Sequence, residues 1–180
     1  MIVSRRTVLD LGVIAAATVT LPGAALPDRT AGPQPGDGFV PVADPGGSAL
    51  RPEVIRRGAA PILVWPKDRK TGLVRDGARF NQVLLLRVLD DAVNEQTDKL
   101  VAFSAICPHA ACLVSGWVAQ ACRLRCPCHG SEYDPTRGGA VVAGPAPLPL
   151  PALPVRVDDG AVTVAGPFSA RPGGHTSRTM

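Results

Sequence analysis

Short apolar runs separated by turn-forming residues make up most of the chain beyond residue 50. None of these runs keeps a 3.6-residue apolar period for three turns, so the pattern predicts strands and at most a short helical piece near 52–57. The strongly apolar run at 82–88 predicts a central strand, and Asp158-Asp159-Gly160 predicts a tight hairpin. The other expected strands are 60–65, 99–106, 113–118, 121–125, 139–143, 153–157 and 161–165, with 113–125 folding as a hairpin.

The composition agrees with a single all-β domain flanked by less regular segments. Of the 180 residues, 46% are apolar and 19% are charged, which is enough apolar sequence for a packed core. The 19 glycines and 19 prolines favour short strands and many turns. We expect the folded domain to span residues 48–168, after a Gly- and Pro-rich linker at 27–47 and before a flexible tail at 169–180.

The N-terminus carries a candidate export signal. Arg5 and Arg6 directly precede an apolar stretch at 8–26. This order resembles a twin-arginine signal, which directs folded proteins out of the cytoplasm. The stretch is barely long enough to span a membrane and is interrupted near its end by Pro22, so residues 1–26 fit either a cleaved signal or a retained membrane anchor. In both cases we expect the domain on the periplasmic side, where disulfides persist.

The formal net charge of +4 does not indicate nucleic-acid binding, because the basic residues form no run and aromatic residues are only 4% of the chain. Four of the five cysteines and two of the three histidines lie instead in two compact clusters. The clusters are Cys107-Pro108-His109-Ala110-Ala111-Cys112 and Cys126-Pro127-Cys128-His129-Gly130-Ser131.

These six Cys and His side chains allow three interpretations. A zinc site uses four ligands and would leave two of the six groups without a role. Purely structural disulfides are a second interpretation. In a third, two cysteines hold one iron, two histidines hold another, and the remaining two cysteines cross-link the loops.

The two clusters closely resemble those of Rieske 2Fe–2S proteins of the cytochrome bc type. The resemblance implies antiparallel sheets or a small barrel, with a cluster-binding part at about 105–148. It also implies roles for the individual side chains. Cys107 and Cys126 would ligate one iron, His109 and His129 the other, and Cys112 and Cys128 would form a disulfide.

Three further positions match features of that family, two of them features of its high-potential members. Ser131 and Tyr133 stand where such proteins donate hydrogen bonds to a bridging sulfide and to a ligand-cysteine sulfur. Hydrogen bonds of this kind raise the reduction potential. Pro145, within 144–147, resembles the proline loop that covers the cluster. The two groups left over, Cys122 and His175, are expected to be a buried strand thiol and a solvated side chain without a role.

The resemblance implies a function in electron transfer as a subunit of an oxidoreductase complex. In a bc-type complex His129 would dock quinol, and the electron would pass to a c-type cytochrome. Ala110 and Ala111 replace the leucine and glycine usual there, and the N-terminal stretch is a poor anchor. These departures leave open the small Rieske subunit of a periplasmic molybdenum oxidase of the arsenite oxidase type. A non-redox exported metal-binding domain is an alternative of another class.

Overall fold

The computed structural model describes residues 28–89 and 98–174. The expected leader at 1–26 and His175 therefore lie outside the described residues. Within the described ranges, no helix combines the length and the apolar character needed to span a bilayer.

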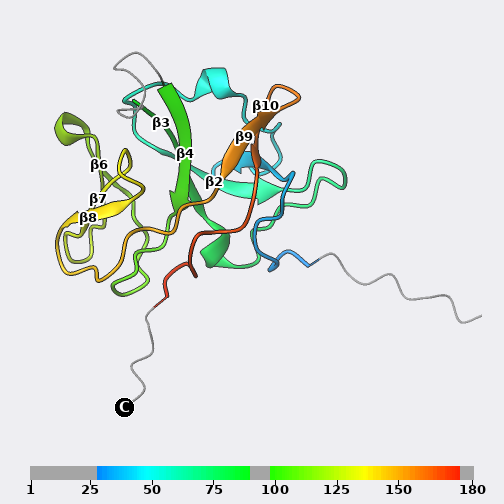
Figure 1. Cartoon of the computed structure of the whole chain (residues 1–180). Coiled ribbons are helices and arrows are strands. Elements are labelled where there is room, and N and C mark those ends of the chain that lie inside the picture. The colour runs from blue at the N-terminus through cyan, green and yellow to red at the C-terminus, as the bar shows by residue number, and fades with distance from the viewer. Residues whose placement is uncertain (1–27, 90–97, 175–180) are drawn as a thin grey trace, which may run out of the picture.

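The described chain is nearly all β, in two antiparallel sheets (Figure 1). The larger sheet has the strand order β4-β3-β2-β1-β10-β9, and the smaller has the order β5-β6-β7-β8. The strands of the larger sheet are β1 (Gly38–Pro41), β2 (Ile62–Lys67), β3 (Val83–Leu89), β4 (Asp98–Ser104), β9 (Val155–Asp158) and β10 (Ala161–Val164). Those of the smaller are β5 (Gly116–Val118), β6 (Arg123–Arg125), β7 (Glu132–Asp134) and β8 (Ala140–Ala143), and three 3₁₀ turns are η1 (Pro52–Val54), η2 (Arg79–Asn81) and η3 (Ala119–Ala121).

The larger sheet curls into a nearly closed barrel. Its two edge strands approach each other where the residues before β9 pair with β4. Leu153 N–H donates to the Ala102 carbonyl at 2.8 Å, and Ser104 N–H donates to the Pro151 carbonyl at 2.8 Å. This pairing satisfies backbone groups that an open sheet edge would leave exposed.

The sequence of β3 is strongly apolar because the strand is buried on both faces. Successive side chains of a strand point to opposite sides. Leu84 and Leu86 pack into one core, which also contains Cys107 and Cys126, whereas Val83 and Leu85 pack into the other. The first core lies between the barrel and the smaller sheet, so both buried cysteines are anchored in a packed interior.

The strand predictions are largely confirmed. A strand overlaps each expected run, and β3 is an interior strand as expected. Asp159 and Gly160, with φ of 49° and 71°, form the tight β9–β10 turn, which needs positive φ at both central residues. The short helical piece near 52–57 is the 3₁₀ turn η1.

Two strands were not predicted. The stretch expected to be a linker at 27–47 contains β1, in which Phe39 and Val40 are fully buried, so the folded unit begins earlier than residue 48. Its strand conformation comes from pairing with β2 and β10 rather than from its short local sequence. Strand β7 has a single apolar residue, Tyr133, and is likewise held by its neighbours β6 and β8.

Candidate metal centre

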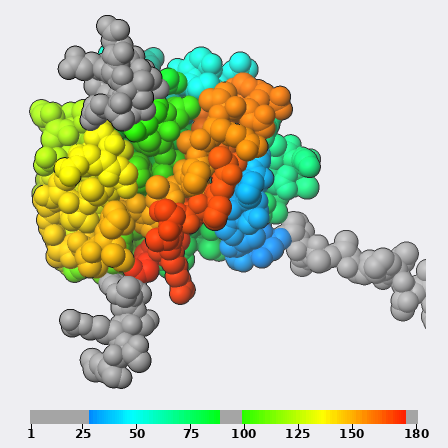
Figure 2. Space-filling model, viewed as in Figure 1, coloured from blue at the N-terminus to red at the C-terminus, as the bar shows by residue number. Residues whose placement is uncertain are grey.

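Two loops at one end of the smaller sheet carry the clustered cysteines and histidines. The first loop, residues 107–112, follows β4, and the second loop, residues 126–131, joins β6 to β7. Figure 2 shows the residues around 130–145 (yellow) on one side of the molecule and the N-terminal described residues (blue) on the other. The C-terminal segment (red) runs between them.

Each of the two loops is closed by two backbone hydrogen bonds, and the pattern is the same in both. In the first, Ala111 N–H donates to the Cys107 carbonyl at 3.0 Å and Cys107 N–H donates to the Cys112 carbonyl at 2.8 Å. In the second, Gly130 N–H donates to the Cys126 carbonyl at 3.0 Å and Cys126 N–H donates to the Ser131 carbonyl at 2.8 Å. The loops are therefore equivalent turns, each beginning with a buried cysteine.

Both turns need a left-handed residue at the same position. Gly130 has φ of 72° and Ala111, its equivalent, has φ of 53°. A side chain in this conformation costs roughly 1 kcal/mol or more, whereas glycine adopts it freely. The first loop is thus strained at Ala111, the position where the second loop has glycine.

Two free thiols lie side by side in the interior beneath the loops. Cys107 and Cys126 are each 1% exposed. Burial raises the pKa of the Cys126 thiol, and the neighbouring Cys107 raises it further. The Tyr133 hydroxyl lies 3.0 Å from Cys107 Sγ in the same interior. Burial and this contact raise the pKa of Tyr133, so the phenol stays protonated and can donate to a thiolate.

The two histidines, one from each loop, meet at the surface. Their Nδ1 atoms are 3.2 Å apart, and the rings are perpendicular, with centroids separated by 4.7 Å. His129 is exposed and His109 is half-buried. Because both Nδ1 atoms point toward each other, the opposite edge of each ring, which bears Nε2, is turned away from the shared contact.

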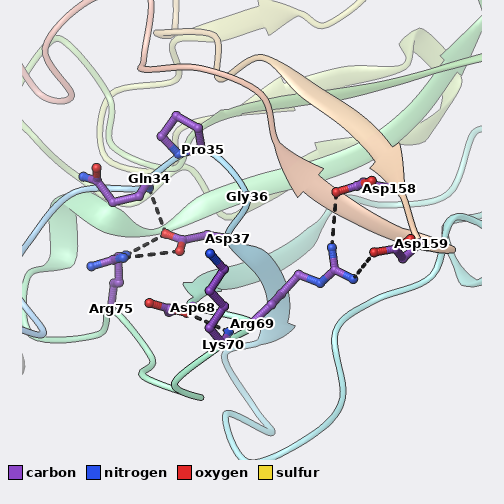
Figure 3. A pocket seen from close by; sticks show the side chains of 10 residues that line it. All are labelled: Gln34, Pro35, Gly36, Asp37, Asp68, Arg69, Lys70, Arg75, Asp158 and Asp159. Carbon is purple, nitrogen blue, oxygen red and sulfur yellow. Dashed lines mark hydrogen bonds and ion pairs between the residues drawn. The ribbon is translucent and has the colours of Figure 1, made fainter.

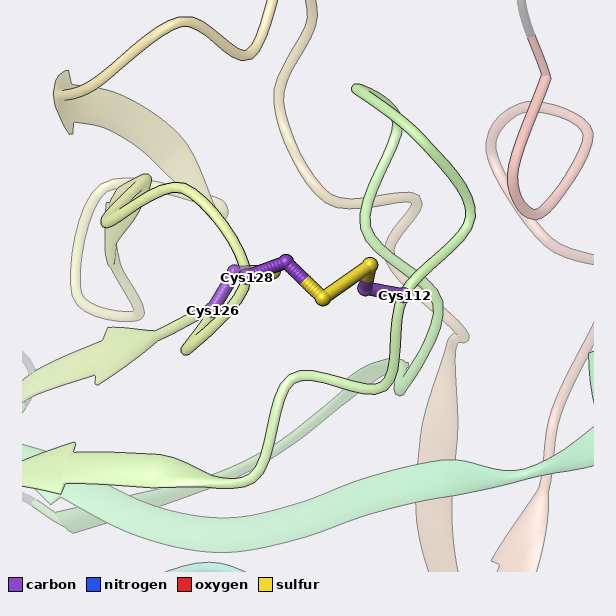
Figure 4. A group of neighbouring side chains, drawn as sticks. All are labelled: Cys112, Cys126 and Cys128. Carbon is purple, nitrogen blue, oxygen red and sulfur yellow. A yellow bond between two sulfur atoms is a disulfide. The ribbon is translucent and has the colours of Figure 1, made fainter.

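A disulfide joins the loops. Cys112 in the first loop is bonded to Cys128 in the second, across a sequence separation of 16 (Figure 4). Their sulfur atoms and that of Cys126 lie within 4.8 Å of one another. Since the disulfide occupies two of these three sulfurs, Cys126 is the member of the group that is free to bind a metal.

The residues expected to surround the cluster are also close by. Ser131 Oγ, which is buried, accepts a hydrogen bond from Ala146 N–H at 3.1 Å. This bond attaches the segment at 144–147, which includes the exposed Pro145, to the second loop. Gly144 lies so near that a Cβ there would come within 2.5 Å of the Ser131 Cα, so only glycine allows this approach.

Cys122 does not lie where the sequence predicted it. It is exposed and left-handed, with φ of 49°, immediately after η3 rather than inside a strand. The expectation of a buried strand thiol is therefore wrong, because the chain turns at Cys122 before β6 begins. The side chain is on the surface and separate from the two loops' buried thiols.

A contact that the sequence did not reveal involves Arg79 in η2. Its Nη2 donates to the Ala111 carbonyl in the first loop at 2.9 Å. The two residues are 32 positions apart, so no local pattern marks the pair.

A polar hollow of about 520 Å³ lies among charged residues of the barrel (Figure 3). Its charges largely pair with one another: Arg75 with Asp37 at 2.6 Å, and Arg69 with Asp158 and Asp159 at 3.4 and 3.3 Å. None of the ten described residues lining it is Cys or His. It therefore offers no donor set for a transition metal comparable to the two loops.

Comparison with known proteins gives consistent matches. The model of the Rieske [2Fe-2S] domain matches residues 51–154. The "Putative respiratory nitrate reductase subunit Rieske" of Haloferax mediterranei is 33% identical over 176 residues, covering 91% of this chain and 76% of that protein. The cytochrome b6-f complex iron-sulfur subunit of Chlorobaculum tepidum is 46% identical over 66 residues, covering 37% of this chain and 35% of that protein. The cytochrome bc1 complex Rieske iron-sulfur subunit of Corynebacterium diphtheriae is 36% identical over 99 residues, covering 49% of this chain and only 24% of that protein.

Proposed function

Because the chain belongs to the Rieske [2Fe–2S] family, we propose that it transfers single electrons from a quinol to a c-type cytochrome, as the iron–sulfur subunit of a bc-type complex. The family's cofactor is one 2Fe–2S cluster, and one-electron transfer at a tunable potential is the chemistry that it supplies. The observation that carries the proposal is the contact at the surface between two imidazoles, one from each of two loops that begin with a buried free thiol.

The side chains of the two loops fit this cofactor. Each loop contributes one buried free thiol and one imidazole, which is the mixed sulfur and nitrogen donor set of a Rieske centre. We assign Cys107 and Cys126 to one iron, and His109 and His129 to the other. Because the pKa of Cys126 is raised, this thiol is protonated when no metal is bound, so metal binding would release its proton.

His129 is the better placed of the two imidazoles for contact with a substrate. It is exposed, whereas His109 is half-buried. With Nδ1 facing inward, its Nε2 edge is available to exchange a proton and a hydrogen bond with a quinol hydroxyl. The segment at 144–147 lies beside the second loop, to which the hydrogen bond from Ala146 N–H to Ser131 Oγ attaches it.

The match to the Haloferax protein favours a second candidate partner, a respiratory oxidoreductase other than a bc-type complex. The Haloferax protein matches over most of its length, whereas the two complex subunits match over 35% and 24% of theirs. The same electron-carrying module would then serve another respiratory oxidoreductase, such as one with a molybdenum subunit. The exposed Ala110, in place of a larger residue beside His109, favours a different docking surface.

We further propose that the protein is exported through its Arg5–Arg6 signal and works on the periplasmic side, either anchored or released. The Cys112–Cys128 disulfide supports this location, because a reducing cytosol does not preserve such bonds. Twin-arginine export also suits a domain whose cofactor is inserted before transport.

The test of function is a redox titration of the purified full chain across about pH 6 to 10, followed by mixing with a ubiquinol analogue and a c-type cytochrome. Proton-coupled chemistry predicts a high midpoint potential that falls with rising pH, approaching about 59 mV per pH unit. It also predicts reduction by the quinol and reoxidation by the cytochrome. A low midpoint that is independent of pH, with no reduction by quinol, would contradict the quinol assignment. Co-purification with a molybdenum-containing polypeptide would favour the second candidate.

Tyr133→Phe and Ser131→Ala are each expected to lower the midpoint potential while the cluster still assembles. The Tyr133 hydroxyl lies 3.0 Å from the Cys107 sulfur, and with the cluster bound it would donate to this sulfur and stabilise the extra negative charge of the reduced state. Loss of such a bond is worth on the order of 1 kcal/mol, or roughly 40 mV for one electron. Potentiometric titration monitored by electron paramagnetic resonance (EPR) measures both variants. Unchanged potentials in both would refute the donor roles.

A further inference from the structure

The 3₁₀ turn η2 reaches the first loop through one side chain. Arg79 Nη2 donates to the Ala111 carbonyl at 2.9 Å, and the guanidinium lies 5.2 Å from the centre of the Phe80 ring. The bond ends on the peptide that joins Ala111 to Cys112. It therefore acts at the position between His109 and the disulfide.

This contact falls on Ala111, the residue at the left-handed position of the first turn. The second turn has Gly130 at its left-handed position and needs no compensation, whereas the first has Ala111 there. A hydrogen bond to the carbonyl of a strained residue holds the peptide in that orientation against relaxation. Arg79 supplies such a bond from outside the loop.

The methyl group of Ala111 lies near the C-terminal segment. Gly173, in the C-terminal segment, packs so closely that a Cβ there would lie 2.9 Å from the Phe80 ring and 3.0 Å from Ile106 Cγ2. The same Cβ would lie 3.5 Å from the Ala111 Cβ. Ala111 is thus fixed through its carbonyl by η2, and its side chain faces the C-terminal segment.

We propose that Arg79 is a positioning residue for the metal centre. Through the Ala111 carbonyl it fixes the turn that carries His109 and Cys112, and its positive charge favours the added electron. The proposal rests on the assignment of His109 as a ligand. It implies that the first loop depends on a residue 32 positions away in the sequence.

The test compares Arg79→Met, Arg79→Lys and a matched control, Arg56→Met, in the full chain. Arg56 is exposed and lies shortly after η1, whose neighbourhood accepts hydrogen bonds from the Arg87 side chain in β3. Arg87 pairs with Leu100 in β4, whereas the first loop follows the opposite end of β4. Two quantities are measured: the midpoint potential by EPR-monitored titration, and the rate at which dithiothreitol reduces the Cys112–Cys128 disulfide.

In Arg79→Met, dithiothreitol is expected to reduce the Cys112–Cys128 disulfide about fivefold faster than in the parent, which is the factor expected for loss of one hydrogen bond. The substitution is also expected to lower the ratio of reduced to oxidised protein at a fixed potential about threefold, or roughly 30 mV. Arg79→Lys should restore the potential because it keeps the charge. Arg56→Met should match the parent in both measurements. If Arg79→Met also matches the parent, the proposal is overturned.

A second variant keeps the proposal testable if Arg79→Met folds poorly. In an Ala111→Gly background the turn no longer needs to be held, so adding Arg79→Met should leave the disulfide reduction rate nearly unchanged. An undiminished acceleration in that background would overturn the positioning role. Failure of the ligand assignment itself is distinguishable, because the parent chain would then lack the EPR signal of a nitrogen-ligated cluster.

Discussion

Replacing Cys107 or Cys126 with serine is expected to give folded protein that holds no 2Fe–2S cluster. The two thiols are the free sulfurs buried beneath the loops, each 1% exposed, and a serine hydroxyl is a poor ligand for iron in this setting. Iron and sulfide per chain should fall from two of each to almost none. Chemical analysis of iron and sulfide after anaerobic reconstitution, with the visible and EPR spectra, measures the loss.

Cys122→Ser is the matched control for this experiment. It is the same chemical change made at an exposed thiol after η3, outside both loops. We expect this variant to load as fully as the parent. Full loading of Cys107→Ser or Cys126→Ser, or a comparable loss in Cys122→Ser, would contradict the ligand assignment.

Breaking the Cys112–Cys128 disulfide should produce the largest loss of stability. The bond closes a sequence separation of 16, and a loop of that length is worth about 3 kcal/mol of the free energy of unfolding. Cys112→Ser and Cys128→Ser should each lower the unfolding free energy by about this amount, because either change removes the same bond. Loss of the cluster under mild denaturant should accelerate in parallel.

Denaturant unfolding followed by circular dichroism measures this effect. The double variant provides an internal control, since it should be no less stable than either single variant. Single variants within about 0.5 kcal/mol of the parent would show that the bond contributes little to holding the loops together.

The sequence predicted the parts of the fold that local pattern determines. The run that forms β3 is apolar on both faces because β3 lies between two cores, and Asp159-Gly160 suits a turn with two positive φ values. Strand β1 was not predicted because its apolar run, Phe39 and Val40, is short and lies in a Gly- and Pro-rich stretch. Its strand conformation depends on pairing with β2 and β10, which the local sequence does not indicate.

The candidate site was predictable to a similar extent. Scarce residue types in two compact clusters marked the loops, and the structure places the Tyr133 hydroxyl 3.0 Å from the sulfur of Cys107. The exposed position of Cys122 and the bond from Arg79 to Ala111 were not predictable. Both depend on where the chain turns in three dimensions, which no spacing along the sequence records.

The central claim is that two imidazoles and two thiolates hold the irons. Pulsed EPR of the reduced full chain, grown with ¹⁵N-labelled histidine, tests it most directly. The account predicts strong couplings from two inequivalent histidine nitrogens, present in His175→Ala and reduced in His109→Ala and His129→Ala. A reduced cluster without any strong nitrogen coupling would mean that the irons are held by sulfur alone.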